Sequence, residues 1–581
     1  MSRENNVVSI GDGQTKGVKT MRQPVTVKPK PSRDDKQMRW FIMMIALYLV
    51  IALAFPLYAM LSRSFKNHDG EFIGLANYFE YFNTPALTYS IQNSLTISII
   101  TMLISVSIAF VLAYAINRSC MKLKGFFKVV ALVPILVPSL LPGIALVYLF
   151  GRQGMITGLL MGHDIYGPIG IVISEVFFTL PHALIIITTA LSIADSRLYE
   201  AAVSLKAGKV KIFFTVTLPG ARYGLISAAF VVFTLTITDF GAPKVIGGDY
   251  NVLATDIYKQ VIGQQNFEMG AVVSFILLLP AALAFFIDRI VQRKQVSLLS
   301  AKAVALEPKP APLFDGLMFL YSSLVAVFIL GILFTCQYAA LVEFYPYNLN
   351  IGLTNYQFDL MDGGGWDSFY NSLELAAWTA TVGTVVVFLG AYMVEKGRGF
   401  TFARGTFQLL AMLPMAVPGL VLGLAYIFLF NSPNNPFNFL YHTMGILVIS
   451  TITHFYTVSH LTAVTALKQM DREFESVAAS LKSPFHRTLR KITVPVCLPA
   501  ILDISIYLFV NAMTTVSAVV FLYGPHTNLA SVAVLNMDDA GDIAPAAAMG
   551  MMIFYTNASV RILHGIFTKG VLKKTQFWRT R

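Results

Sequence analysis

The feature that most constrains this chain is its succession of long apolar segments. Of its 581 residues, 56% are hydrophobic and only 13% are charged, whereas soluble domains carry about 25% charged residues. A helix that crosses a bilayer needs roughly 20 mostly apolar residues, and about twelve segments meet this requirement. They lie near residues 41–61, 92–117, 126–150, 167–193, 223–240, 269–290, 313–337, 370–394, 407–430, 443–467, 497–518 and 545–567. We therefore predict an all-α polytopic membrane protein with about 12 transmembrane helices.

The distribution of Lys and Arg indicates how the chain is oriented. These residues gather in the N-terminal tail and in segments 118–124, 289–294, 396–404 and 561–581, whereas loop 341–368 contains none. Because cytoplasmic loops carry an excess of Lys and Arg, we expect a multi-pass membrane protein with both termini in the cytoplasm. The polar tail 1–39 is expected to be disordered. We interpret its basic residues as topological signals and expect no nucleic-acid partner.

The apolar segments fall into two similar halves. The motif NSL at 93–95 returns at 371–373, and ALVPILVPSLLPGIA at 131–145 aligns with AMLPMAVPGLVLGLA at 411–425. Each half would hold an even number of crossings, so the copies share one orientation and form two parallel six-helix repeats. We expect a cytoplasmic tail 1–39, a first repeat 40–296, a cytoplasmic linker 297–312 and a second repeat 313–581.

A pair of prolines recurs in the third apolar segment of each half. Pro134 and Pro138 align with Pro414 and Pro418. Proline kinks a membrane helix where neighbouring groups satisfy the freed backbone, so we expect kinked third helices near the pseudo-symmetry axis. A structural kink and a gating hinge in the translocation pathway are both open interpretations.

A polar stretch between the fourth and fifth apolar segments also recurs. Residues 191–219 align without a gap with residues 467–495 and share eight of 29 positions. The shared pairs are Leu191/Leu467, Asp195/Asp471, Ala202/Ala478, Ser204/Ser480, Leu205/Leu481, Lys206/Lys482, Thr217/Thr493 and Pro219/Pro495. On the expected topology both copies face the cytoplasm.

Each copy is predicted to fold as a short helix, a turn and a second helix. The i, i+3, i+4, i+7 spacing of apolar residues makes one helical face. This face consists of Leu198, Ala201, Ala202 and Leu205 in the first copy and of Phe474, Val477, Ala478 and Leu481 in the second. Asp195 and Asp471 are placed to cap the first helix. Gly208 in one copy and Pro484 in the other are expected to end it.

Two interpretations of these helices differ in what they contact. Basic amphipathic helices can rest on lipid headgroups, which accounts for the Lys and Arg residues of both copies. A face of small residues with polar flanks instead suits the groove of another protein. The alanines and the shared turn favour the second interpretation.

The stretch EAAVSLKAG followed by TLP resembles the EAA loop of permease subunits of binding-protein-dependent ABC importers. The matching residues are Glu200, Ala201, Ala202, Leu218 and Pro219. Lys206 and Lys482 stand where this family usually has glycine. In the second copy Ser476 occupies the glutamate position and Glu475 precedes it.

The resemblance implies that loops 195–219 and 471–495 couple the chain to ATP-hydrolysing subunits. The partners implied are two copies of a cytoplasmic ABC ATPase, a periplasmic substrate-binding protein and the lipid bilayer. The location implied is the bacterial inner membrane. The sequence has no G-x-x-x-x-G-K-[ST] phosphate loop. We therefore expect a transport subunit and not an enzyme, with ATP and Mg bound by the partner and no cofactor or metal in this chain.

The resemblance also suggests a substrate. Fused six-span halves resemble the ferric-iron and 2-aminoethylphosphonate branch, and segments 238–273 and 536–555 are most similar to its 2-aminoethylphosphonate permeases. We expect an ATP-driven importer of 2-aminoethylphosphonate. The alternatives are a ferric-iron ABC permease and, in a different class, a secondary transporter driven by an ion gradient.

Two acidic residues are candidates for the translocation pathway. Glu175 lies within the fourth apolar segment and Asp239 at the end of the fifth, and intramembrane acids are often functional. A carboxylate there could bind the ammonium group of a zwitterionic substrate, or it could form a hydrogen bond between helices. The second half has Thr451 at the position of Glu175, which disfavours a proton relay in both halves.

Overall fold

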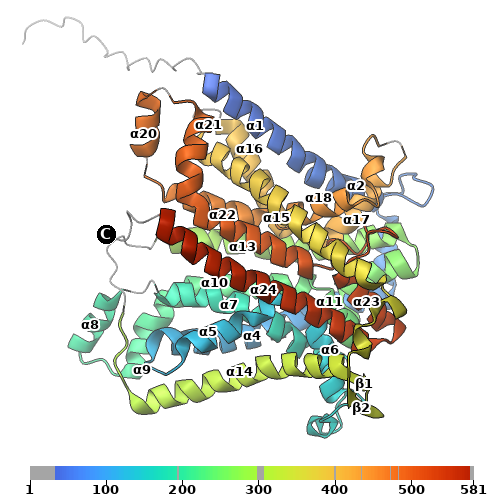
Figure 1. Cartoon of the computed structure of the whole chain (residues 1–581). Coiled ribbons are helices and arrows are strands. Elements are labelled where there is room, and N and C mark those ends of the chain that lie inside the picture. The colour runs from blue at the N-terminus through green and yellow to red at the C-terminus, as the bar shows by residue number, and fades with distance from the viewer. Residues whose placement is uncertain are drawn as a thin grey trace, which may run out of the picture.

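The structure is a computed structural model that describes residues 33–192, 195–297, 306–397, 401–433, 435–471, 473–481 and 483–575. Most of the tail 1–39, the central part of the linker 297–312 and Lys482 lie outside the described residues. Figure 1 shows a bundle of long helices with short helices at both of its ends.

The long helices of the first half follow its apolar segments. They are α1 (Arg33–Leu49) continued by the π-helix η1 (Val50–Ala54) and α2 (Phe55–Arg63); α4 (Pro85–Arg118); α5 (Lys124–Leu132), the 3-10 turn η2 (Val133–Leu136) and α6 (Leu140–Phe150); α7 (Pro168–Ser192); α9 (Lys209–Ile212), the π-helix η4 (Phe213–Thr217) and α10 (Leu218–Thr238); and α13 (Phe267–Ser297).

The second half repeats this order. Its helices are α14 (Pro312–Leu341); α15 (Gly365–Lys396); α16 (Thr401–Met412), η8 (Leu413–Ala416) and α17 (Gly419–Phe430); α18 (Met444–His454) and α19 (Tyr456–Lys468); α21 (Phe485–Thr488), the π-helix η10 (Leu489–Thr493) and α22 (Val494–Thr514); and α24 (Ile543–Thr575).

Among the described residues, nine helices are long and apolar enough to cross a membrane, and three helix pairs meet this criterion only together. The pairs bend by 104° between η2 and α6, by 113° between η8 and α17, and by 56° between α18 and α19. If each bent pair is one span, the total is up to 12, one for each apolar segment. The predicted fold class is confirmed.

The bent third span of the first half joins opposite ends of the bundle. We call the end that carries α8 (Ser196–Ser204) and α20 (Glu473–Ser480) the loop end, and the end that carries strands β1 (Val342–Phe344) and β2 (Asn348–Ile351) the hairpin end (Figure 1). Before α5, the Cys120 N–H donates to Asp315 near the start of α14 (2.7 Å). After α6, Gln153 donates to the Tyr347 hydroxyl beside the strands (3.4 Å). This span therefore crosses the bundle despite its bend.

The first span of each half packs on the other half. Helices α1 and α2 contact α15, α16 and α17 of the other half, besides α13 of their own, and α14 contacts α4, α5 and α6 of the other half, besides α24 of its own. Tyr48 of α1 is hydrogen-bonded to Thr453 of α18 (2.9 Å), and Tyr321 of α14 donates to the Ile108 carbonyl of α4 (3.1 Å). The two sequence repeats thus exchange their first spans, which ties the halves together.

The repeated NSL motif fixes the same junction in both halves. Asn93 donates to the Asn251 carbonyl (2.9 Å), and Asn371 donates to the Asn528 carbonyl (3.0 Å). The serines that follow, Ser94 and Ser372, each accept from the first backbone N–H of a short helix at 2.8 Å. These helices are α12 (Leu253–Tyr258) and α23 (Ala530–Ala540). The motif therefore anchors the chain between the fifth and sixth spans.

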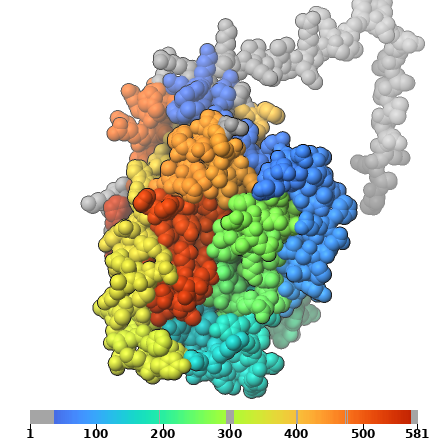
Figure 2. Space-filling view, turned by 90° about the vertical axis from the view of Figure 1, so that its right-hand side faces the viewer, coloured from blue at the N-terminus to red at the C-terminus, as the bar shows by residue number. Residues whose placement is uncertain are grey.

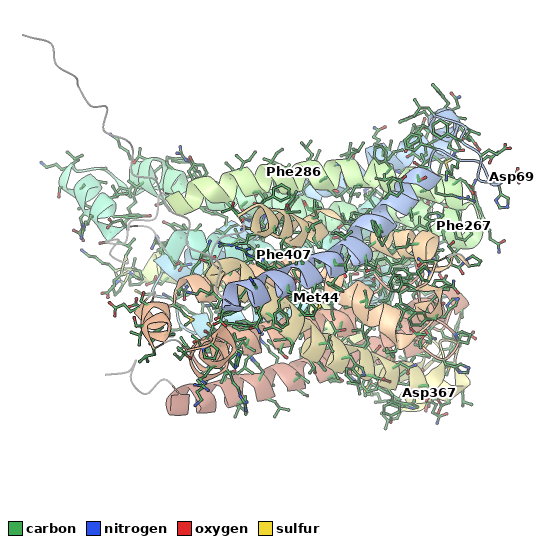
Figure 3. All side chains as sticks on the ribbon, turned by 90° about the horizontal axis from the view of Figure 1, so that it is seen from above. Met44, Asp69, Phe267, Phe286, Asp367 and Phe407 are labelled. Carbon is green, nitrogen blue, oxygen red and sulfur yellow. The ribbon has the colours of Figure 1, made fainter. Side chains whose placement is uncertain are left out.

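The hairpin end carries short elements and acidic residues. Besides α12 and α23 it contains α11 (Gly241–Ile246) and the π-helix η5 (Lys259–Gly263), and Figure 3 places Asp69 and Asp367 there, at the end where α13 begins with Phe267. The antiparallel strands pair Val342 with Ile351. The sequence pattern predicted only a loop at this position. The remaining short elements are α3 (Ala76–Asn83), η3 (Thr157–Leu160), η6 (Thr354–Tyr356), η7 (Phe358–Leu360) and η9 (Asn438–Leu440).

Candidate functional site

The first copy of the repeated loop forms helix α8, which Asp195 caps. The Asp195 carboxylate accepts a hydrogen bond from the Arg197 N–H (3.1 Å). In the second copy the Asp471 carboxylate accepts in the same way from the Glu473 N–H (3.0 Å) at the start of α20. Both aspartates therefore satisfy free backbone donors at a helix N-terminus, as their positions predict.

The turn after α8 is formed by Lys206 and not by Gly208, which corrects the expected break. Lys206 has φ +55°, the left-handed conformation that usually ends a helix at glycine. The Lys206 N–H donates to the Val203 carbonyl (2.8 Å) and the Ala207 N–H to the Ala202 carbonyl (3.0 Å). Gly208 is extended, with φ −68°, a conformation open to any residue. The turn thus lies where the resembled family has its glycine.

The second copy keeps one of these hydrogen bonds: the Ser483 N–H donates to the Ala478 carbonyl (2.9 Å), as that of Ala207 does to Ala202. The Leu481 N–H donates to the Val477 carbonyl (2.9 Å). Lys482 lies outside the described residues. Pro484 was expected to end the first helix, but α20 ends at Ser480, and Pro484, with φ −65°, is instead the N-cap of α21.

The exposed sides of α8 and α20 carry large apolar side chains among polar ones. Leu198, Val203 and Leu205 are 59%, 63% and 83% exposed, and Val477 and Leu481 are 57% and 76% exposed. Ala202 and Ala478 are buried against the chain itself, so the predicted four-residue face is divided between the outside and the inside. Glu200 and Ala201 are exposed and Phe474 is half-buried; the Glu475 side chain lies outside the description.

Helix α8 is attached to the fifth span by polar contacts. The Tyr199 hydroxyl donates to Thr217 (3.1 Å), and the Arg118 guanidinium lies 5.3 Å from the centre of the Tyr199 ring. From Lys209 to Thr238 the chain is one helical span that contains Pro219 in its first turns. Helix α8 is therefore in contact with the start of the fifth span.

The second loop is attached differently, through the N-terminal span. The Phe485 N–H at the start of α21 donates to the Asp34 carboxylate of α1 (2.9 Å), and the rings of Phe41 and Phe485 lie 6.3 Å apart. Residues 485–514, including Pro495, again form one helical span. Both fifth spans contain a π-helix at aligned positions, η4 and η10. π-Helices are rare in proteins, and those that occur are often found at functional sites.

The four predicted pathway prolines lie at the sharpest bends of the structure. The carbonyls of Pro134 and Pro414 each accept from the N–H three residues later (3.2 Å) in a 3-10 turn, and Pro138 and Pro418 precede the second helix of each pair. The expected kink is therefore a complete break. At the first break Asn557 of α24 donates to the Leu136 carbonyl (3.1 Å), so the sixth span of the other half lines this bend.

Glu175 and Asp239 are brought together near the first break. Glu175 is fully buried on α7, and its carboxyl group interacts with that of Asp239 at the end of α10. The Asp239 carboxylate accepts from the Ala242 N–H (2.9 Å). Neither Glu175 oxygen makes a hydrogen bond of normal geometry to a described residue. The two candidate acids thus form a pair in the first half, in which Glu175 is buried and Asp239 is half-buried.

An ion pair that the sequence analysis missed joins the halves at the hairpin end. Lys244 of α11 lies 2.8 Å from Asp539 of α23. Nothing in the hydropathy pattern reveals this pair, because it depends on how two loops almost 300 residues apart meet. The consecutive acids Asp538 and Asp539 in an apolar chain are the available sequence signal.

A surface hollow of about 670 Å³ lies beside this region. Arg152, Asp164 and Asp249 contribute charges of both signs, and Tyr166 and Tyr250 line it. It is formed by the loops before α7 and before α12. Its mixed charge suits contact with another polar surface.

Comparison with known proteins identifies the family of this chain. The model of the family "Binding-protein-dependent transport system inner membrane component" matches residues 105–297 and 386–573. The chain belongs to this family. It is therefore the membrane-spanning permease of an ABC importer that depends on a binding protein.

The two matched stretches correspond to the later spans of each half. Each contains one copy of the repeated loop, whereas the exchanged first spans, residues 33–63 and 312–341, lie outside them. This permease thus contains two family domains in one chain, each covered by a first span from the other half.

Two curated relatives match most of the permease. It is 26% identical over 541 residues to the ferric transport system permease protein FbpB of Actinobacillus pleuropneumoniae, covering 90% of this chain and 77% of the relative. It is 27% identical over 515 residues to the putative ferric transport system permease protein FbpB 1 of Haemophilus influenzae, covering 86% and 80%. A solved bacterial ABC transporter for alginate matches 45% of this chain and 96% of its own, at 17% identity and a TM-score of 0.39.

Proposed function

We propose that this permease belongs to an ATP-driven importer of ferric iron and that α8 and α20 each dock into one copy of a cytoplasmic ABC ATPase. The observation that carries the proposal is the matched pair of exposed apolar helices, one in each family domain. An ion-gradient-driven transporter has no use for two such helices at the same end.

Docking is supported by the side chains that α8 and α20 leave exposed. Burying a leucine contributes about 1.5–3 kcal/mol. The first loop exposes three large apolar side chains, Leu198, Val203 and Leu205, and the second exposes two, Val477 and Leu481. Glu200 and the Asp195 cap surround the first of these sets with polar groups. A small apolar face with a polar edge favours a protein groove.

The fifth spans provide the mechanical connection. Residues 209–238 and 485–514 are continuous helical spans of 30 residues each, about 45 Å at 1.5 Å per residue. When nucleotide draws the two ATPases together, the loops approach each other and these spans move with them. The hairpin end would then open toward the binding protein, because nucleotide favours the state in which the loops are close.

The proposed orientation follows from charge. The loop end carries the basic segments 118–124 and 561–575, and acidic residues such as Asp69 and Asp367 lie at the hairpin end (Figure 3). The positive-inside rule then places the loop end and both termini in the cytoplasm. A periplasmic binding protein would dock at the hairpin end, where the mixed-charge hollow lies.

Ferric iron is the substrate best supported by the relatives. The relatives that match most of this chain carry ferric transport names, which favours the ferric alternative over the 2-aminoethylphosphonate expected from the sequence. The acidic character of the hairpin end is also compatible with a cation. No feature of the acid pair Glu175–Asp239 specifies an ammonium group.

Uptake of radiolabelled ferric iron by cells that produce the complete transporter tests the proposal. Leu205→Glu and Leu481→Glu should each lower ATP-dependent uptake by at least about tenfold, because a carboxylate cannot be buried in an apolar groove. Leu123→Glu is the matched control, since Leu123 is exposed at the loop end outside both loops. Full uptake in both loop variants would contradict docking.

The energy source and the substrate are tested in the same cells. Depletion of ATP with the proton gradient maintained should stop uptake, whereas a secondary transporter would continue. Parallel measurements with 2-aminoethylphosphonate decide between the two substrates. Uptake of the phosphonate without uptake of iron would overturn the ferric assignment and leave the ATP-driven class intact.

A further inference from the structure

We infer that Lys244 and Asp539 form a latch that holds the two halves together at the hairpin end and has to open before substrate enters. The Lys244 Nζ lies 2.8 Å from Asp539 Oδ1. Lys244 belongs to the first half and Asp539 to the second. The inference rests on the proposed transport function and identifies a residue pair that controls it.

The lysine is held between a ring and a carboxylate. Its Nζ lies 5.4 Å from the centre of the Tyr258 ring on α12, within the range of a cation–π interaction. The Tyr258 ring in turn stacks on Phe521 of the second half, with centroids 6.2 Å apart and planes at 22°. An ionic contact and an aromatic contact therefore bridge the halves at one place.

The bridge lies at the ends of the spans that the loops move. Helix α11 follows α10, and α23 lies between α22 and α24. Figure 2 faces the hairpin end and shows the green segment that contains α11 and α12 directly against the red segment that contains α23. Approach of the loops at one end and separation of α11 from α23 at the other are thus parts of one rocking movement.

Helix α11 is fixed tightly enough to position the lysine. A Cβ on Gly241 would lie 2.2 Å from the Ser139 Oγ at the break of the third span, so only glycine allows this close approach. The Lys244 N–H donates to the Phe240 carbonyl (3.0 Å). A displacement of the third span at Ser139 therefore has to displace α11, and Lys244 with it.

The charges around the pair favour the closed contact only while Lys244 is present. Asp538 lies next to Asp539, and burial, followed by the charge of Asp539, raises the pKa of Asp538 to about 7, while Lys244 lowers it. The ammonium group of Lys244 therefore stabilises the charged forms of both carboxylates on α23. Removing Lys244 takes away the charge that attracts α23 to α11 and should loosen the hairpin end.

The strength of the pair suits a latch that opens in every cycle. The side chains of Lys244 and Asp539 are 20% and 42% exposed, so water replaces the lost contact when they separate. Ion pairs with such exposure shift an equilibrium by up to about fivefold. A fully buried pair would cost far more to open.

The latch occurs once and has no symmetric copy. The positions aligned with Lys244 and Asp539 in the opposite halves are Val520 and Gly263. A charge exchange between the two residues is therefore free of interference from a second pair. This asymmetry makes a decisive test feasible.

The test measures exposure of a reporter cysteine in the full chain in lipid nanodiscs. Val520→Cys is introduced after Cys120, Cys336 and Cys497 have been replaced, because Val520 is buried next to Phe521. The rate of maleimide labelling reports opening of the hairpin end. Lys244→Ala and Asp539→Ala should each raise this rate by about two- to fivefold.

Three further variants separate the latch from simple destabilisation. Lys244→Arg retains the charge and should label at the parent rate, as should Lys259→Ala, whose side chain contacts Asn251 within the first half. The exchanged pair Lys244→Asp with Asp539→Lys should return the rate toward that of the parent. Parent-like rates in the alanine variants, or an exchanged pair that labels as fast as either alanine variant, would overturn the inference.

This assay requires neither substrate nor ATPase. If Leu205→Glu abolishes uptake while the alanine variants label at the parent rate, the latch is wrong and the proposed function stands. If the labelling rates behave as expected while Leu205→Glu leaves uptake unchanged, the latch stands and the coupling proposal fails.

Discussion

Replacement of Lys206 by glycine should stabilise helix α8. Lys206 adopts φ +55° at the end of this helix, and two backbone hydrogen bonds, from Lys206 to Val203 and from Ala207 to Ala202, depend on that conformation. The Lys206 side chain is exposed. The substitution therefore changes the backbone preference of the turn and leaves the packing of α8 as it is.

The expected gain can be worked from the two opposing effects. The left-handed conformation costs a residue with a Cβ about 1–2 kcal/mol, a cost that glycine avoids. Glycine loses about 0.5–1 kcal/mol more conformational entropy on ordering. The net stabilisation is on the order of 0.5–1 kcal/mol, which lowers the local opening equilibrium of α8 by about two- to fivefold.

Hydrogen exchange of the α8 amides, residues 198–205, measures this equilibrium in nanodiscs. Lys206→Gly should slow exchange by about two- to fivefold. The matched control is Lys209→Gly, because Lys209 begins helix α9 and glycine in a helix costs about 1 kcal/mol; exchange in α9 should become faster. Unchanged or faster exchange of α8 in Lys206→Gly would refute the assignment of the turn to Lys206.

Two more outcomes follow from single contacts. Gly241→Ser should destabilise the protein by about 1–3 kcal/mol, because the added side chain would overpack against Ser139. Adding Ser139→Gly should restore most of this loss. Thermal unfolding of both single variants and of the double variant in nanodiscs measures the two effects. A second outcome concerns the pH dependence of stability. The pKa of Asp538 is about 7 in the native state and about 4 in the unfolded chain, so the native state binds this proton more tightly. Asp538 therefore makes the free energy of unfolding fall as the pH rises from about 4 to about 7, and Asp538→Asn should remove this fall. Melting temperatures from pH 4 to pH 8, with exposed Asp367→Asn as the control, measure this decline, and an unchanged slope in Asp538→Asn would contradict it.

The spans could be predicted from the sequence, whereas their partners could not. Hydropathy located every apolar segment because the bilayer imposes one length and one polarity on each. The packing of α1 and α14 on the other half was not predictable, since hydropathy shows that a segment crosses the membrane but not which helix it contacts. The contacts of Tyr48 with Thr453 and of Tyr321 with Ile108 join residues hundreds of positions apart.

The turn of the first loop shows where local sequence rules fail. Gly208 was expected to break the helix because glycine is a poor helix former, yet the break lies at Lys206, two residues earlier. The alignment of the two copies contained the better signal. Lys206 and Lys482 are identical, whereas Gly208 faces Pro484, and a turn common to both copies is more consistent with the shared position.

The two halves also preserve a contact while exchanging its residues. At the first break Ser139 meets Gly241, and at the second the roles are reversed: a Cβ on Gly419 would lie 2.3 Å from the Ser517 Oγ. Each junction has room for one side chain, supplied from either side. In the alignment of the halves, Ser139 stands opposite Gly419 and Gly241 opposite Ser517. Both positions differ, although the contact is the same.

A similar exchange occurs between the fifth and sixth spans and involves charge. In the first half Asp288 of the sixth span accepts from Ser227 of the fifth (2.5 Å). At the aligned positions of the second half the carboxylate belongs to the fifth span, as Asp503, and lies 3.9 Å from His564 of the sixth. Selection acting on the contact can keep one acid at this junction without fixing the helix that carries it. Polar residues of the two halves are therefore best compared as contacting pairs and not position by position. The same applies to Glu175, whose aligned residue in the second half is Thr451.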